Sequence, residues 1–426
     1  MTIEADFAIV HANELVTLKG AGSKPRIREE MNDLGIIHDG AVAVKDETVV
    51  AVGTTNEVLK KLEKGFEIID ATGKLVTPGL IDAHVHLIFA GSREQELESM
   101  AVGGISYLEI KARGGGMPTT LKKTGEATTE KLLERTTQIL DTMLIHGTTT
   151  IEAKSGYEMT LHGEIRQLEI INTLNRTHPI DLVPTFLAQG IPPEYENKVD
   201  QLTNTIVEEW IPEIAKRKLA EYCDVFCEKG YFNVEQTRRI LETGRRHGMK
   251  LRIHADWLIH SGGAKLGAEL GVVSADHLIF TPIDDIEALS KKGTVGIFLP
   301  TTPFCYIGTY AKARDIINRR LAVALATDLS AANMCESMQM MMTIAVLQMK
   351  MTTEEALTAS TINAAHSIER AHEIGSLEEG KRADIVVFDA LNHKYFPYHY
   401  GINLAEKVFK NGELVAEKGR RVKQRS

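Results

Sequence analysis

Short apolar runs separated by Gly, Asn and Asp dominate both ends of the chain. In the first 75 residues, such runs predict β-strands at 7–10, 40–44, 49–53 and 66–70. The pattern returns with strands at 383–389, 405–410 and 414–415, where Asn411-Gly412 is suited to a hairpin turn. Because both ends predict strands, we expect residues 1–75 and 375–426 to form one composite β-sandwich domain.

The middle of the chain, residues 76–374, alternates short apolar strands with stretches of helical spacing. Helical periodicity over 128–145 and 233–246 ends beside Gly147 and Gly248, where C-caps belong. This order is typical of a parallel sheet with helical crossovers, and the strand count favours a closed (β/α)8 TIM barrel. An open doubly wound sheet is the alternative, but no GxGxxG follows the first strand. Eight strands are predicted, at 79–83, 148–152, 181–185, 224–227, 251–254, 272–276, 294–298 and 322–326.

Composition excludes several classes of protein. The chain has 426 residues, of which 43% are hydrophobic and 25% charged, and this length suits one barrel plus a smaller domain. With 49 Lys and Arg against 58 Asp and Glu, the net charge of -9 predicts no nucleic-acid partner. No signal-peptide pattern and no long apolar run is present, so we expect a cytoplasmic protein without a membrane partner. The four cysteines are widely spread, and disulfides are not expected.

Polar residues gather where the predicted barrel strands end. His84 and His86 lie two apart at the end of the first strand, so both side chains point to one face. His254, His277 and Asp328 end the fifth, sixth and eighth strands. Since the carboxyl ends of barrel strands meet at one mouth, these five residues are expected to converge. Imidazole and carboxylate suit a borderline divalent ion, and the sequence therefore predicts a metal site.

With these residues identified, the sequence resembles the amidohydrolase superfamily, which has this barrel, an appended β domain and the same strand-end ligands. Further blocks resemble one branch of it, the imidazolonepropionase family, over essentially the whole chain. This resemblance implies hydrolysis of a C–N bond in a small cyclic amide or amidine that bears a carboxylate. The blocks are Phe-Ala-Gly-Ser-Arg-Glu at 89–94, Gly-Gly-Gly at 114–116, Glu-Ala-Lys-Ser-Gly-Tyr at 152–157, Pro-Pro-Glu-Tyr at 192–195, Asp-Val-Phe-Cys-Glu at 224–228 and Ser-Ala-Asp-His-Leu at 274–278.

The resemblance also implies a cofactor, one divalent metal ion. Zinc is expected, with iron as the alternative, and the implied ligands are His84, His86, His254 and Asp328. His277 would contact the substrate or the attacking water.

The substrate carboxylate has its own implied partners. By resemblance, Arg93 and Tyr157 hold the carboxylate and Tyr107 lines the pocket. A guanidinium fork and a phenol also suit a carboxylate on chemical grounds. The plainer alternatives are a salt bridge from Arg93 to Glu94 or Glu96, and a packing role for Tyr157.

Three positions depart from the family pattern. Where the family has His-Ala-Asp-Glu, with the Glu as acid and base, this chain has Trp257 in place of the Glu. A ring-contacting His after the third strand is replaced by Gln189 or Gly190, and an amide after the eighth strand by Ser330. Since the metal-binding and carboxylate-binding residues are kept, we expect a working hydrolase with a related but different ring.

The missing Glu leaves the proton transfers to other groups. We predict that Asp328 accepts the proton of the attacking water and that His277 stabilises the oxyanion. Trp257 is expected to stack on a flat ring. For Glu228 we favour a structural role as the partner of a nearby Lys or Arg; the alternatives are a third candidate proton acceptor or the ligand of a second metal.

Rival functions remain open on sequence alone. One is a deaminase or desulfhydrase acting on an imidazolidine-type ring, and another is a hydrolase of acyclic amides. From a different class, a catalytically inactive, metal-stabilised binding protein would explain the loss of the Glu, but the joint retention of the metal-type residues weighs against it. A homodimer is the default expectation, since related barrels often dimerise.

Overall fold

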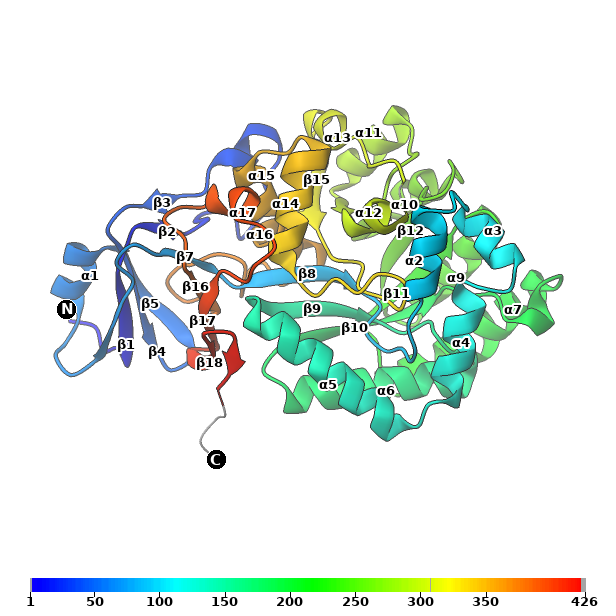
Figure 1. The fold of residues 1–426 in the computed structure, drawn as a ribbon, viewed down its shortest axis with the longest axis horizontal. Helices are drawn as coiled ribbons and strands as arrows, with labels where there is room; N and C mark the ends of the chain where they lie inside the picture. The colour runs from blue at the N-terminus through cyan, green and yellow to red at the C-terminus, as the bar shows by residue number, and fades with distance from the viewer. Residues whose placement is uncertain (1, 307, 423–426) are drawn as a thin grey trace.

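Eight parallel strands form a closed barrel in the computed structural model, which describes residues 2–306 and 308–422 (Figure 1). Each strand pairs with the next in chain order. The ring closes after the last strand, where the N–H of Asp328 donates to the carbonyl of His84 (3.2 Å) and the N–H of His86 to that of Leu329 (2.9 Å). The predicted TIM barrel is confirmed and the open sheet is excluded. The strands are β8 (Leu80–Val85), β9 (Thr148–Lys154), β10 (Asp181–Ala188), β11 (Tyr222–Cys227), β12 (Lys250–Ala255), β13 (Ser274–His277), β14 (Val295–Phe298) and β15 (Ala322–Leu325).

Helices cover the outside of this barrel. The predicted helix after 128 is α5 (Thr129–Ile145), which begins where the Thr128 side chain accepts the N–H of Lys131 and ends before Gly147 at a φ of 96°. The helix after 233 is α9 (Val234–Arg246), capped reciprocally by Asn233 and Gln236. The other covering helices are α6 (Leu161–Thr177), α8 (Ile211–Lys216), α10 (Gly263–Leu270), α11 (Ile283–Lys292), α13 (Ala313–Asn318), α14 (Met338–Met349), α15 (Thr353–Ala359) and α16 (Ile362–Ser367).

Further helices belong to the loops and to the chain ends. The long segment after β8 carries α2 (Glu94–Ala101), α3 (Tyr107–Ala112) and α4 (Met117–Glu126), which lie at the end of the barrel away from the β domain (Figure 1). None of the helices in the described part of the chain is long and apolar enough to cross a membrane. The remaining ones are α1 (Thr55–Lys61), α7 (Val199–Thr205), α12 (Thr301–Tyr306) and α17 (Tyr395–Tyr398), with short 3-10 or π turns at Arg28–Asn32, Pro193–Tyr195 and Ile206–Trp210.

The two chain ends build one β domain of two sheets. One sheet comes from the N-terminal segment alone, and the other joins N-terminal and C-terminal strands because β7 pairs antiparallel with β16, so that blue and red segments lie side by side in Figure 1. Their facing side chains, such as Ile9, Val42 and Ile385, form a shared apolar core, as in a sandwich. The first sheet runs β5 (Thr48–Thr54), β4 (Gly40–Lys45), β1 (Phe7–Ala12) and β6 (Glu67–Asp70); the second runs β19 (Arg420–Arg421), β18 (Glu413–Glu417), β17 (Ala405–Lys410), β16 (Ile385–Phe388), β7 (Leu75–Pro78), β2 (Glu14–Val16) and β3 (Ile36–Ile37).

A single glycine, Gly79, joins the β domain to the barrel. It separates β7 from β8, and a Cβ atom at this position would lie 2.2 Å from the Thr149 Oγ1 and 2.6 Å from its Cγ2. Thr149 is itself buried in β9, so its side chain has no space into which it could move away from a Cβ at position 79. The close approach of β8 to β9 therefore requires glycine here.

We predict that Gly79→Ala lowers the free energy of unfolding by about 1–3 kcal/mol, because the methyl group overpacks a buried joint. Gly125→Ala is the matched control, since nothing lies within 4 Å of a Cβ at Gly125 in α4. Alanine in a helix is favoured over glycine by about 1 kcal/mol, so this variant should keep or gain stability. Chemical denaturation of both variants measures the difference, and equal stabilities would contradict the prediction.

Candidate active site

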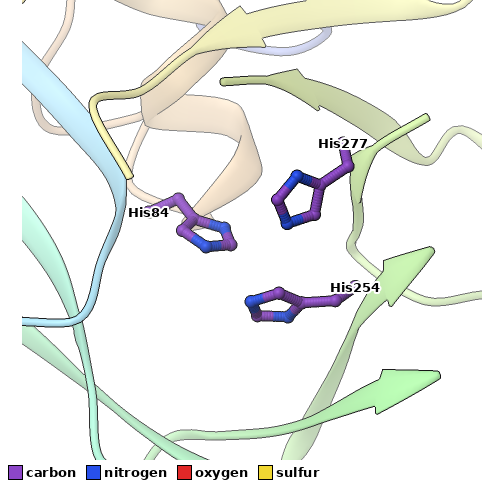
Figure 2. Close-up of side chains that lie close together, drawn as sticks. All are labelled: His84, His254 and His277. Carbon is purple, nitrogen blue, oxygen red and sulfur yellow. The ribbon is translucent and has the colours of Figure 1, made fainter. Parts of the chain in front are cut away.

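The residues predicted to converge, the four implied metal ligands and His277, meet at one end of the barrel. His84 lies in β8 and His86 directly follows it, His254 lies in β12, His277 ends β13 and Asp328 follows β15. Figure 2 shows the rings of His84, His254 and His277 facing one another from three strands. Their ring centroids lie 4.5 to 5.8 Å apart, and all five side chains are buried. The strand-end argument from the sequence thus brings the right residues together.

The spacing of the donor atoms fits a metal ion. The Nε2 atoms of His84 and His86 are 3.3 Å apart, and the Asp328 Oδ1 lies 3.6 and 3.3 Å from them. Two ligand atoms bound at ~2.0–2.1 Å in a tetrahedral zinc site are about 3.3 Å apart. Donor atoms of His84, His254 and His277 form a second group within 4.8 Å. The Nε2 of His254 is buried and has no hydrogen-bond partner among the described residues. A divalent ion therefore suits this set of donors.

Carboxylates behind two of the histidines orient the rings. The His84 Nδ1 lies 2.7 Å from the Asp276 Oδ2, and the His254 Nδ1 lies 3.1 Å from the Asp224 Oδ2. Each carboxylate accepts a hydrogen bond from the Nδ1–H, which leaves the lone pair of each Nε2 facing the shared centre. Burial lowers the pKa of His84 well below its usual value and that of His277 to about 3, so both rings are neutral.

Beneath these rings lies a fully buried cluster of charges. The Lys154 Nζ is 3.0 Å from the Glu152 Oε1 and 2.8 Å from the Asp224 Oδ2. Arg252 lies 3.6 Å from Glu152 and 3.7 Å from Asp276, and it also donates to the carbonyls of Ser367 and Ala83. Burial would lower the pKa of Lys154, but Asp224 and Glu152 outweigh it and hold that pKa above its usual value. The side chain of Lys154 is therefore protonated and carries a positive charge.

The sum of these buried charges matches a divalent ion. Counted as ionised, Lys154 and Arg252 give two positive charges, and four carboxylates give four negative charges, a net charge of -2. Burial raises the pKa of Asp82 to about 7, and that carboxyl is not part of the count. Burial raises the pKa of Asp276 too, but its contacts with Arg252 and the His84 Nδ1 favour the ionised form in which it is counted. Uncompensated buried charge is costly, and a dication at the donor atoms would balance it. The four carboxylates are those of Glu152, Asp224, Asp276 and Asp328.

All six residues predicted to bind substrate line one cavity above the histidines. Its volume of about 40 Å³ holds only a few water molecules, at roughly 10–15 Å³ each. A ring-sized substrate must therefore displace side chains to enter. The sequence did not single out four further lining residues, Met117, Phe226, Tyr306 and Ala332. The six predicted ones are Arg93, Tyr107, Tyr157, Gln189, Trp257 and Ser330.

Arg93 lines this cavity and also forms an ion pair with Glu96. Only 7% of the residue is exposed, and its Nε donates to the Glu96 Oε2 at 2.8 Å. The Glu96 Oε1 accepts the N–H of Gly116 at 2.8 Å, so Glu96 fixes the guanidinium to the glycine-rich loop before α4. The salt bridge considered as the plainer alternative thus exists, but it is buried beside the pocket. Burial also raises the pKa of Tyr157, so that phenol keeps its proton and can donate.

Trp257 fills much of the pocket and is held from behind. Its ring stacks on His277, with centroids 5.4 Å apart and an interplanar angle of 21°, and Tyr306 meets it edge-on at 5.6 Å. Glu228 accepts the backbone N–H groups of Trp257, Leu258 and Lys229, each at 2.9 Å. Glu228 does not line the pocket. Its carboxylate holds the loop after β12, which supports the structural interpretation over a second metal.

Other residues that shape the site escaped the sequence analysis. The Thr302 Oγ1 donates to the Asp328 Oδ2, and the Asn333 Nδ2 donates to the carbonyls of Thr327 and Asp328. These contacts hold Asp328 at a φ of 53°, and His277 has a φ of 75°, both in the left-handed region that costs energy for residues other than glycine. No local motif marks Thr302 or Asn333, because each contacts Asp328 only once the loops of the barrel have folded.

Comparison with known sequences gives a consistent result. The chain matches the model of the amidohydrolase family over residues 75–415. Imidazolonepropionase from Alkaliphilus metalliredigens is 46% identical over 419 residues, which are 97% of this chain and 99% of that protein. The enzyme of the same name from Geobacillus kaustophilus is 46% identical over 96% of this chain and 97% of its own length. The one from Clostridium tetani is 40% identical over 96% and 98%.

Solved structures share the fold at much lower identity. A zinc-bound adenosine deaminase from Xanthomonas campestris has a TM-score of 0.74 at 17% identity, over 100% of this chain and 96% of that chain. A zinc-bound atrazine chlorohydrolase from Arthrobacter aurescens has a TM-score of 0.70 at 16% identity, over 98% and 96%. Together with the strand-end histidines, the full-length sequence matches show that the chain belongs to the amidohydrolase family and, within it, to the imidazolonepropionases.

Proposed function

We propose that the protein is a metal-dependent hydrolase that cleaves a C–N bond of a small cyclic amide or amidine bearing a carboxylate. The observation that carries this proposal is a single buried pocket, lined by three metal-type ligands together with Arg93 and Tyr157. A pocket that combines a cation-binding centre with a buried guanidinium and a phenol suits a small anionic substrate.

We assign the ion to His84, His86, His254 and Asp328, and we favour zinc because imidazole and carboxylate donors at tetrahedral spacing are typical of it. Iron is the alternative. When bound, such an ion polarises a carbonyl and lowers the pKa of water to about 7.

The protein's own groups would move the protons. In this proposal Asp328 takes the proton of the attacking water at Oδ2, the oxygen that the Thr302 hydroxyl contacts. His277 is neutral, and it would stabilise the oxyanion through a ring N–H. Trp257 covers one face of His277 and keeps bulk water from that ring. These roles need no acid and base at position 257.

Substrate recognition would divide between the carboxylate and the ring. Arg93 and Tyr157 would hold the carboxylate, and Glu96 keeps the guanidinium in position. The Gln189 Oε1 is buried and has no donor among the described residues, so a ring N–H would satisfy it. The other predicted contacts with the ring are Tyr107, Trp257 and Ser330.

The decisive experiment is a substrate screen with the zinc-loaded enzyme. Imidazolone propionate, its hydantoin and thiohydantoin analogues, and N-acyl amino acids are assayed for ring opening, ammonia and sulfide. We expect ring opening, and we expect His84→Ala to lose the metal and at least about 10³-fold in kcat/KM. His372→Ala changes an exposed histidine and should leave both unchanged.

Each rival function has its own outcome in this screen. Release of ammonia or sulfide without ring opening would support a deaminase or desulfhydrase. Turnover of the N-acyl amino acids alone would support a hydrolase of acyclic amides. Tight binding without any turnover would support an inactive binding protein.

The carboxylate assignment predicts a selective effect of Arg93→Met. A charge-assisted hydrogen bond contributes about 1.5–3 kcal/mol, so KM for the carboxylate substrate should rise roughly 10- to 100-fold. For the carboxamide analogue of the same ring, KM should change little. Arg113→Met alters an exposed arginine on the neighbouring loop and serves as control. A similar rise in KM for both substrates would contradict this role for Arg93.

Trp257→Glu tests the hypothesis that the substitution of Trp257 for the family's Glu changes which ring is accepted. The substitution opens space and adds a proton acceptor, so kcat/KM on imidazolone propionate should rise by about tenfold or more. Trp257→Gln opens the same space without the carboxylate and should not reproduce the gain. Equal rates for the two variants would show that the size of the pocket, not proton transfer, decides activity on this ring.

A further inference from the structure

Among the described residues, Lys154 is the one cation that pairs with both carboxylates behind the metal-facing histidines. Its Nζ lies 2.8 Å from the Asp224 Oδ2 and 3.8 Å from the Asp276 Oδ2. Asp224 in turn holds the Nδ1 of His254, and Asp276 holds the Nδ1 of His84. A single ammonium on β9 is thereby linked to two rings on β12 and β8.

Sequence alternation explains how the strands assemble this arrangement. Glu152 and Lys154 are two apart on β9, as are Arg252 and His254 on β12, so each pair shares the inward face. In the parallel register His254 lies beside Asp276. All the charged side chains of the cluster are completely buried, so bulk solvent does not screen their contacts.

Simple attraction for a metal ion does not explain a lysine here. An ammonium near the donor atoms repels a cation, and its charge helps to lower the pKa of His84. The cluster contains two buried cations, Lys154 and Arg252, and among the described residues only Lys154 pairs with Asp224. Arg252 pairs instead with Glu152 and Asp276. Without Lys154, the Asp224 carboxylate would lose this ion pair and keep its contact with the ring of His254, which it orients.

We infer that Lys154 is a positioning residue: by fixing Asp224 and Asp276, it holds His254 and His84 in the tautomer whose Nε2 faces the metal. This inference rests on the proposed metal-dependent function and deepens it. Lys154 does not line the substrate pocket, and its ion pairs are with Glu152, Asp224 and Asp276 rather than with the assigned ligands His84, His86, His254 and Asp328. Its effect reaches the ion only through the two carboxylates and the rings that they hold.

The test compares Lys154→Met with Glu152→Gln in the full-length enzyme. Glu152→Gln is the matched control, because Glu152 contacts the same ammonium but neither histidine. Each zinc-loaded protein is challenged with a chromophoric chelator to measure zinc affinity, and ring ¹⁵N NMR of the metal-free proteins reports the tautomers of His84 and His254. Thermal unfolding checks that each variant is folded.

We expect Lys154→Met to weaken zinc affinity about 10- to 100-fold, as is typical when groups behind metal ligands are lost. The NMR signals should show mixed tautomers at His254 and His84, whereas Glu152→Gln should retain zinc like the wild type. Unchanged or tighter zinc binding by Lys154→Met would overturn the inference, and tighter binding is what charge repulsion alone predicts. If Lys154→Met does not fold, the double variant with Glu152→Gln keeps the net charge of the cluster and decides the question by the same measurements.

The wild-type result separates the two proposals. A wild-type enzyme that retains about one equivalent of neither zinc nor iron would contradict the proposed function itself. A wild-type enzyme that retains zinc, with Lys154→Met retaining it equally and with the same tautomers, would contradict only the role of Lys154.

Discussion

The ion network in the middle of the barrel is the constraint on which the rest of the site depends. Two cations and three carboxylates from four strands of the barrel, β9, β11, β12 and β13, are fully buried, and each finds its partners inside the protein. A shift of register in one of these strands would separate buried charges from their partners. The same network holds the rings of His84 and His254, so the folding of the barrel and the geometry of the metal donors have one physical cause.

The upper part of the pocket is held by aromatic packing and by hydrogen bonds to loop backbone rather than by buried ion pairs. Its walls are aromatic and its cavity is small, with Trp257 packed against His277 and Tyr306. Glu228 and Glu96 hold the surrounding loops through backbone N–H groups rather than by contacting the pocket's centre. The metal-type donors thus lie in barrel strands or shortly after them, whereas the groups that would contact the substrate lie in the longer segments that follow the strands. Loop changes can therefore alter the ring that is accepted without disturbing the donors.

Much of this molecule follows from local patterns in the sequence. Short apolar runs between stretches of helical spacing predicted the eight barrel strands, and Asn411-Gly412 predicted the hairpin between β17 and β18. The convergence of His84, His254, His277 and Asp328 needed only the rule that parallel strands end at one mouth. The blocks around Arg93 and Tyr157 marked residues that now line one pocket.

Tertiary structure decided what depends on contacts between distant strands and loops. Thr302 and Asn333 support Asp328, and Glu96 pairs with Arg93, but none of the three carries a motif that shows what it touches. Lys154 stood in a recognised block, yet its link to Asp224 and Asp276 exists only once the barrel closes. A sequence specifies which face of its strand a residue occupies, because that depends on neighbours in the chain. Which charge it meets across the barrel is fixed by the register of other strands, and only the folded protein reveals it.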